Sequence, residues 1–136
     1  MKRIIIHWTA GTYFPTNYEK EHYHFLIDKN GNIHNGKFSP ASNEICKIGK
    51  YAAHTGGGNT GSIGVAMCAM AGFKNSKNVG KYPISKIQFE STMDLCAKLA
   101  KKYSKGSLSS KVGVIYTKRK FLKKPPAANL GYVTYK

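Results

Sequence analysis

Two runs of apolar residues dominate the hydrophobic pattern of the chain. The first consists of the three isoleucines at positions 4–6, and the second covers residues 63–70. Neither run alternates with polar positions, which is typical of strands buried on both faces of a sheet. The first run ends at His7, and small, turn-forming residues follow it. A buried strand therefore holds this histidine rigidly, so a metal ligand and a hydrogen-bonded core histidine are both open interpretations.

The pattern also predicts a β-hairpin. Residues 21–28 are rich in strand-forming residues, Asn30-Gly31 lies at the centre of a turn, and a second short strand begins at Ile33. Side chains alternate between the two faces of a strand, so Tyr23 and His24 are expected to point in opposite directions. We therefore assign His24 to structure.

Helical periodicity is confined to one segment. Ser85 and Gln88 have the spacing of a capping box, in which each side chain satisfies a backbone N–H at the start of a helix. Apolar residues then recur at helical spacing up to about Tyr103, which predicts a packing helix without catalytic residues. Residues 112–116 predict a last strand, and we expect irregular structure beyond it.

Length and cysteine content indicate a single domain. The 136 residues are enough to bury about two-thirds of the unfolded surface. The three cysteines are widely spaced and lack a C-x-x-C motif, so we expect neither a disulfide framework nor a zinc ribbon. No apolar stretch approaches the about 18 residues of a membrane-spanning helix, and the first run is too short for a signal peptide. We expect a protein made in the cytoplasm without a signal peptide and without membrane insertion.

The net charge of +16 is unevenly distributed. Residues 101–136 contain 10 of the 22 basic residues and none of the 6 acidic ones. A block of like charge usually forms a solvated or interacting segment. Its sign suits a polyanion, either nucleic acid or the acidic polymers of a bacterial cell wall.

A glycine-rich loop precedes the second apolar run. Four of the seven residues 56–62 are glycines, and the strand follows them. A phosphate-binding loop needs the opposite order, with a strand before the loop and a helix after it. The order of these segments therefore argues against a nucleotide site.

Three segments together resemble a known family. They are Ile-Ile-Ile-His-Trp-Thr-Ala-Gly at 4–11, His-Tyr-His-Phe-Leu-Ile-Asp at 22–28, and Ala-His-Thr-Gly-Gly-Gly-Asn-Thr-Gly-Ser-Ile-Gly-Val at 53–65. In this order and at these separations they resemble the zinc-dependent N-acetylmuramoyl-L-alanine amidases, which include phage endolysins of the T7-lysozyme type and peptidoglycan recognition proteins. The resemblance covers roughly residues 3–103.

The resemblance implies an α/β fold with a mixed central sheet flanked by helices. It divides the chain into an amidase-like domain, residues 1–110, and a divergent basic C-terminal segment of the same domain, residues 111–136. The implied reaction is hydrolysis of the amide between N-acetylmuramic acid and L-alanine in peptidoglycan, with zinc activating a water molecule. The implied partner is peptidoglycan or a muropeptide, and we expect a monomer that acts on the cell wall.

The resemblance also implies roles for individual residues. His7 corresponds to the first zinc ligand, and Tyr23 to a tyrosine that hydrogen-bonds the developing oxyanion or assists proton transfer. Four residues correspond to a wall of the substrate groove: His54, Thr55, Gly57 and Asn59. His22 and His34 are expected at the surface.

Two of the family's three zinc ligands are missing. They should follow the helix, yet the chain has no His after His54, no Asp after Asp94 and no Cys after Cys96. One hypothesis is an out-of-frame C-terminal segment, because a reading frame displaced by two bases can place a His codon across residues 116–117 and an Asp codon across residues 133–134. A segment that evolved as a polybasic binding region is the alternative.

Three functional classes follow from these observations. The first is a peptidoglycan amidase of phage type, and the second is a catalytically inactive relative that still binds muropeptides. The third is a basic nucleic-acid-binding protein, although no helix-turn-helix, RNP-like or zinc-finger pattern accompanies the charge. Wall binding, release of L-alanine peptides and retention on DNA separate the three.

Overall fold

The computed structural model describes residues 1–104, 112–116 and 132–135. Its elements, in chain order, are β1 (Arg3–Trp8), α1 (Asn17–His22), β2 (Phe25–Ile27), β3 (Ile33–Asn35), the 3₁₀ turn η1 (Pro40–Asn43), β4 (Ser62–Met67), α2 (Lys86–Ser104), β5 (Val112–Tyr116) and β6 (Tyr132–Tyr135). In the part of the chain so described, no helix is both long and apolar enough to span a membrane.

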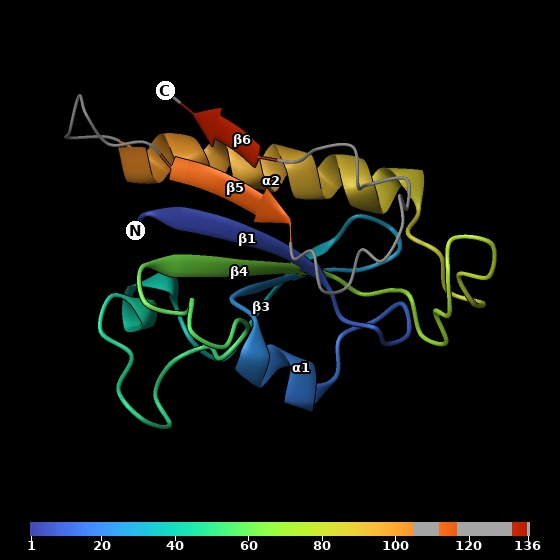
Figure 1. Cartoon of the computed structure of the whole chain (residues 1–136), viewed down its shortest axis with the longest axis horizontal. Coiled ribbons are helices and arrows are strands. Elements are labelled where there is room, and N and C mark those ends of the chain that lie inside the picture. Colours follow the sequence, from blue (N-terminus) through green and yellow to red (C-terminus); the bar gives the residue numbers. More distant parts are fainter. Residues whose placement is uncertain (105–111, 117–131, 136) are drawn as a thin grey trace.

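The six strands form one mixed sheet in the order β3-β2-β4-β1-β5-β6. The four inner strands are parallel to one another, while the edge strands β3 and β6 pair antiparallel with β2 and β5. Helix α2 packs along one face of this sheet, and α1 lies on the opposite side (Figure 1). The mixed sheet with flanking helices confirms the predicted fold class.

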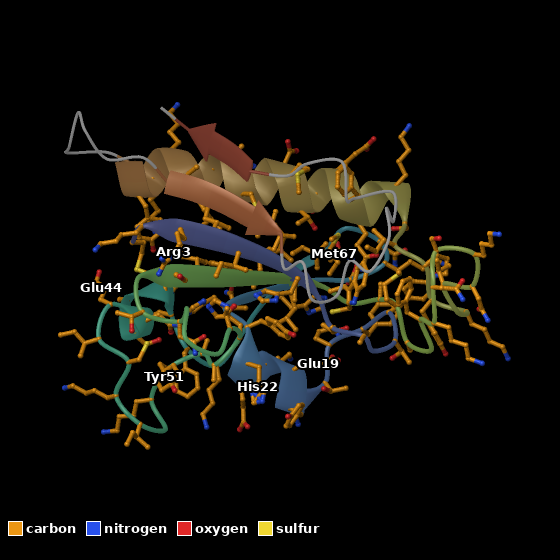
Figure 2. All side chains as sticks on the ribbon, in the orientation of Figure 1. Arg3, Glu19, His22, Glu44, Tyr51 and Met67 are labelled. Atoms are coloured by element: carbon orange, nitrogen blue, oxygen red, sulfur yellow. The ribbon has the colours of Figure 1, made fainter. Side chains whose placement is uncertain are left out.

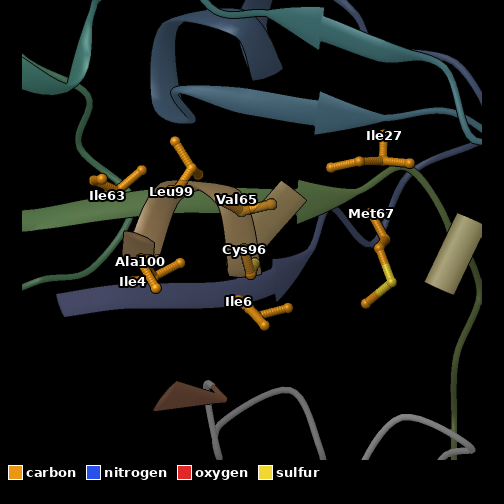
Figure 3. Close-up of a cluster of buried hydrophobic side chains, with 9 residues drawn as sticks. All are labelled: Ile4, Ile6, Ile27, Ile63, Val65, Met67, Cys96, Leu99 and Ala100. Carbon is orange, nitrogen blue, oxygen red and sulfur yellow. The ribbon is translucent and has the colours of Figure 1, made fainter. Parts of the chain in front are cut away.

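The two apolar runs form the centre of the sheet. β1 and β4 are parallel neighbours, and Ile4 pairs with Ile63. One face of these strands packs against α2, and Figure 3 shows the resulting core of Ile4, Ile6, Ile27, Ile63, Val65, Met67, Cys96, Leu99 and Ala100. Because side chains alternate along a strand, His7 points to the other face, away from α2.

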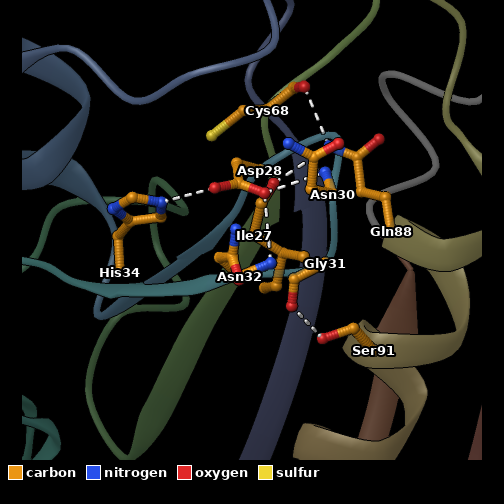
Figure 4. A network of polar contacts seen from close by, with 9 residues as sticks. All are labelled: Ile27, Asp28, Asn30, Gly31, Asn32, His34, Cys68, Gln88 and Ser91. Atoms are coloured by element: carbon orange, nitrogen blue, oxygen red, sulfur yellow. Dashed lines mark hydrogen bonds and ion pairs between the residues drawn. The ribbon is translucent and has the colours of Figure 1, made fainter.

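The predicted capping box fixes the start of α2. The Gln88 N–H donates to Ser85 Oγ at 3.1 Å, and the Ser85 N–H donates to Gln88 Oε1 at 3.2 Å. The buried Gln88 amide also donates to the carbonyl oxygens of Ile27 and Cys68, each at 2.9 Å (Figure 4). One side chain therefore caps the helix and joins it to the ends of β2 and β4.

The hairpin forms at the predicted turn. Asp28 accepts hydrogen bonds from the backbone N–H groups of Asn30 and Asn32, and its second carboxylate oxygen lies 2.8 Å from His34 Nε2 (Figure 4). These hydrogen bonds lower the pKa of the Asp28 carboxyl even though its burial acts to raise it. The turn is thus held by a carboxylate that is itself fully hydrogen-bonded.

The strand predicted over residues 21–28 is shorter in the structure. Residues 21 and 22 belong to α1, which begins with a capping box between Thr16 and Glu19, and only Phe25–Ile27 form β2. The capping box at Thr16 begins a short helix that continues through residues 21 and 22. Tyr23 therefore lies at the end of a helix rather than inside a strand.

The C-terminal strand β6 differs from the irregular structure expected after residue 116. Residues 132–135 pair antiparallel with β5, with Val114 opposite Val133. The residues after 116 show no convincing period of apolar positions, so this strand was not predicted. The rest of the segment expected to be irregular lies outside the described residues.

Candidate functional site

The site forms around His7, near the end of β1. His7 is 1% exposed, and its Nε2 lies 3.2 Å from His54 Nδ1 and 3.4 Å from Thr55 Oγ1. The His7 and His54 rings meet edge to face with centroids 5.2 Å apart. The structure thus brings together two residues 47 positions apart in the sequence, one from a strand and one from the glycine-rich loop.

Tyr23 also packs against the His7 ring. Its ring centroid is 5.2 Å from that of His7, and the residue is 8% exposed. Burial, with a smaller contribution from the Glu19 carboxylate, raises the pKa of the Tyr23 phenol to about 12. The phenol is therefore protonated at neutral pH and can donate a hydrogen bond, although it is presented by the extended residue after α1 rather than by the predicted strand.

His54 packs directly over β4. A Cβ placed on Gly64 would lie 2.5 Å from the His54 ring, so the strand has a glycine where the imidazole rests on its backbone. The His54 Nε2 faces the Ser62 carbonyl oxygen at 3.4 Å, which favours the tautomer with its proton on Nε2. Burial, followed by the nearby His24, lowers the pKa of His54 to about 4, so the ring is neutral at pH 7.

The glycine-rich loop is shaped by Asn59. Its Oδ1 accepts from the backbone N–H groups of His54 and Thr55 at 3.0 and 2.8 Å. The side-chain oxygen of Asn59 therefore acts inside the loop, while Gly57 has a φ of +76° and open space around its Cα. Of the four predicted groove residues, His54 and Thr55 contact His7, and Gly57 and Asn59 form the loop that carries them.

A buried polar network beneath the loop was not predicted from sequence. His24 Nδ1 accepts from the Gly64 N–H, and its Nε2 donates to Asn43 Oδ1, both at 2.9 Å. The Asn43 amide in turn donates to the carbonyl oxygens of Ala52 and Asn59. The structural assignment of His24 agrees with this arrangement, but nothing in the local sequence pattern marks Asn43 as its partner.

The remaining histidines are partly exposed. His34 joins the hairpin network through Asp28, and the His22 ring lies against Tyr18 with centroids 4.3 Å apart. Neither is among the residues around His7. A shallow hollow is lined by residues that include His22 and Ala53, which precede Tyr23 and His54 in the chain. Its full lining is Glu21, His22, Lys37, Phe38, Gly49, Tyr51 and Ala53. Figure 2 labels His22 and Tyr51, which lie on the same side of the sheet as α1.

The residues present do not reproduce the family's zinc site. Within residues 1–104 and the described strands, no group of three His, Cys, Asp or Glu side chains could hold a metal ion. Position 117, where the displaced-frame hypothesis places part of a His codon, lies outside the described residues. Positions 133–134 belong to β6, of which only the backbone is described. Among the described side chains, His7 is thus the one position that corresponds to an expected zinc ligand.

Comparison with known protein families shows to which of them the chain belongs. A sequence model described as N-acetylmuramoyl-L-alanine amidase matches residues 1–120. The chain belongs to this family. No curated protein matches the sequence.

Solved structures support the same fold. Bumblebee PGRP-SA is similar with a TM-score of 0.57 and 18% identity, over 94% of this chain and 76% of that one. The amidase LysC from Clostridium intestinale gives a TM-score of 0.51 and 20% identity, over 76% of this chain and 64% of LysC. This amidase-family chain thus spans less than two-thirds of the length of LysC, and at such identities the likeness concerns the fold.

Proposed function

We propose that this chain binds peptidoglycan in the region of the buried cluster of His7, Tyr23 and His54 and of the hollow lined by the residues that precede Tyr23 and His54 in the chain. Three observations support the proposal: membership of the amidase family, the convergence of these residues from separate segments, and the hollow that adjoins two of those segments. The contact of His7 with both Tyr23 and His54 carries the most weight, because these are the positions to which the family resemblance assigns metal binding, catalysis and substrate binding.

The chemistry of the hollow suits a sugar–peptide polymer. Tyr51 and Phe38 supply apolar rings, and the half-exposed Lys37 supplies a cation that can pair with a stem-peptide carboxylate. Tyr23, which packs against His7, keeps its phenol protonated at neutral pH. A ligand with sugar hydroxyls, amides and free carboxylates would use each of these groups.

Among the candidate activities, the available metal-ligating side chains favour binding of peptidoglycan without efficient hydrolysis. The sequence lacks His, Asp and Cys at the positions expected for the second and third zinc ligands. The described side chains contain no three-ligand replacement of those types. A chain of this kind recognises muropeptides but lacks the family's metal-activated water.

Amidase activity of the phage endolysin type is the second candidate. His7 and Tyr23 favour it, because both catalytic positions implied by the resemblance face one another in the structure. Under this alternative, Tyr23→Phe removes the hydrogen-bond donor for the developing oxyanion and lowers turnover with little effect on folding. Nucleic-acid binding is a third outcome, motivated by the charge of +16.

Co-sedimentation with purified peptidoglycan tests the proposal. We expect wild-type protein to sediment with the wall, His54→Ala to remain largely in solution, and His34→Ala, which alters a histidine outside the site, to sediment like wild type. New L-alanine amino groups in the supernatant would indicate the amidase alternative. Retention on DNA at about 0.2 M salt without any wall binding would contradict the proposal and favour the nucleic-acid alternative.

A further inference from the structure

The loop of residues 44–51, which follows η1, exposes two large apolar side chains. Ile48 is 98% exposed and Ile45 is 74% exposed, which makes them the most exposed large hydrophobic residues in the described part of the chain. Figure 2 labels Glu44 and Tyr51 at the two ends of this loop, which projects away from the sheet. Single exposed apolar residues are ordinary on protein surfaces, but two within four positions of one projecting loop form a candidate contact surface.

A backbone hydrogen bond places Ile48 at the tip of a tight turn. The Lys50 N–H donates to the Lys47 carbonyl oxygen at 2.9 Å, so residues 47–50 form a β-turn with Ile48 and Gly49 at its centre. Gly49 has a φ of +75°, the left-handed conformation that type II turns require at this position. Turn tips usually carry Gly, Pro, Asn, Asp or Ser. The backbone therefore holds an isoleucine in water at a position where a small or polar residue is usual.

The loop is also attached to the body of the protein. Cys46 lies between the two isoleucines in the sequence, and its Sγ is 3.6 Å from Thr60 Oγ1 and 3.9 Å from the Asn43 carbonyl oxygen. The Lys47 N–H donates to the Ile45 carbonyl oxygen at 2.8 Å, which adds a second turn. The two exposed side chains are thus presented on a framework with its own hydrogen bonds.

Cations accompany the two isoleucines. Lys47 and Lys50 are exposed at the base of the turn. With Ile45 they line a shallow hollow whose other residues are Ala41, Ser42 and Glu44. Glu44 is the only acidic residue in the sequence of the loop, against two lysines, and the whole chain carries a net charge of +16. Aliphatic and cationic side chains on one surface are the combination with which peripheral proteins bind anionic membranes.

We propose that the 44–51 loop docks on a lipid bilayer with anionic headgroups. Ile45 and Ile48 enter the boundary between headgroups and acyl chains, and Lys47 and Lys50 pair with the lipid phosphates. This is a peripheral contact that requires no membrane-spanning helix. A second copy of the chain is a poorer occupant because it carries the same large positive charge, and a nucleic acid would leave both isoleucines in water. The inference does not depend on peptidoglycan binding.

Co-sedimentation with lipid vesicles tests the inference. We expect the full-length protein to sediment with vesicles of equal parts phosphatidylglycerol and phosphatidylcholine, and to stay in solution with vesicles of phosphatidylcholine alone. Ile45→Ser and Ile48→Ser should each lower the partition coefficient roughly tenfold, as expected for partial burial of one aliphatic side chain. Lys47→Gln and Lys50→Gln should each lower it about fivefold. Ile87→Ser, which alters a 60% exposed isoleucine on α2, is the matched control and should bind like wild type.

A fluorescent reporter separates insertion from attraction by charge alone. Ile48→Trp places an indole at the tip of the turn, while the single native indole, Trp8, is 2% exposed and does not report on the surface. We expect the emission of this variant to shift to the blue on addition of the anionic vesicles. Lipids with brominated acyl chains should quench it.

Two results would overturn the inference. One is the absence of binding to anionic vesicles by folded wild-type protein, which would leave a protein partner as the occupant of the loop. The other is equal binding of wild type and Ile48→Ser with no blue shift from Ile48→Trp, which would mean that charge alone attracts the chain. Thermal unfolding checks that the variants are folded. Co-sedimentation with peptidoglycan is a separate measurement, so failure of membrane docking and failure of the proposed function are distinguishable.

Discussion

At the scale of single residues, the site depends on close packing between His54 and the backbone of β4. The sequence motif that carries the family resemblance indicated His7, Tyr23 and His54, and the structure places them in one cluster. The motif did not indicate why residue 64 is a glycine, or which residue holds the glycine-rich loop in place. Those features arise from contacts between distant segments, which no local pattern encodes.

Gly64→Ala should displace His54. The added Cβ would lie 2.5 Å from the imidazole, so the ring must move off the strand at a cost of about 1–3 kcal/mol in unfolding free energy. We expect weaker binding to peptidoglycan as well as a lower melting temperature. Gly56→Ala is the matched control, because no atom lies within 4 Å of the Cβ it would gain and its φ is not positive. Equal losses in the two variants would contradict the proposed packing.

His24 should make stability fall in mild acid. Burial lowers its pKa from 6.5 to about 4, so the folded protein excludes a proton that the unfolded chain accepts. The stability present above about pH 6.5 is therefore lost progressively as the pH falls toward 4, by up to about 3 kcal/mol. Urea unfolding measured across this pH range gives the slope. Because burial also lowers the pKa of His54 to about 4, we expect His24→Gln to reduce the slope without abolishing it. An unchanged slope would disprove the role of His24.

At the scale of elements, local signals predicted the hairpin turn, the start of α2 and β5, whose bounds match the expected residues 112–116. The boundary between α1 and β2 was wrong because the capping box at Thr16 continues the helix to His22. Glu21 and His22, which were assigned to the strand, thus belong to the helix that this capping box begins. β6 was missed since its pairing with β5 depends on tertiary contact alone.

Gln88→Ala should destabilise the protein more than an ordinary helix substitution. The change removes the reciprocal cap at Ser85 and leaves the buried carbonyls of Ile27 and Cys68 without this donor, which costs about 1–3 kcal/mol. Denaturant unfolding checks the value. Glu90→Ala on the same helix breaks only an exposed ion pair with Lys86 and should cost about 0.5 kcal/mol or less. Similar costs for the two variants would show that Gln88 does not join helix and sheet.

At the scale of the whole molecule, the fold presents its two faces differently. α2 covers one face of the sheet with the main apolar core, and α1 lies on the opposite side (Figure 1). His7, which alternates with Ile6 along β1, points to that opposite side and contacts His54 there. The sequence predicted this α/β arrangement because the family motifs fall on β1, β2 and β4. The net charge of +16 adds a long-range attraction to anionic surfaces that is not specific to the site.

This distinction predicts two kinds of salt dependence. Binding to whole wall, with its anionic polymers, should weaken strongly between low salt and about 1 M salt, where the Debye length falls to about 3 Å. Binding to peptidoglycan stripped of those polymers should weaken much less, because it relies on the short-range contacts of the site. Sedimentation of both preparations over the salt series provides the comparison. Equal losses on the two preparations would mean that charge alone drives wall binding.

The central claim is that the cluster of His7, Tyr23 and His54 is where peptidoglycan binds. Titration of ¹⁵N-labelled protein with a soluble muropeptide, followed by the backbone amide resonances, measures this residue by residue. We predict saturable shifts concentrated at His7, Tyr23 and residues 53–59, with little change along the exposed face of α2. Shifts that avoid these residues, or no saturable shift at all, would contradict the account.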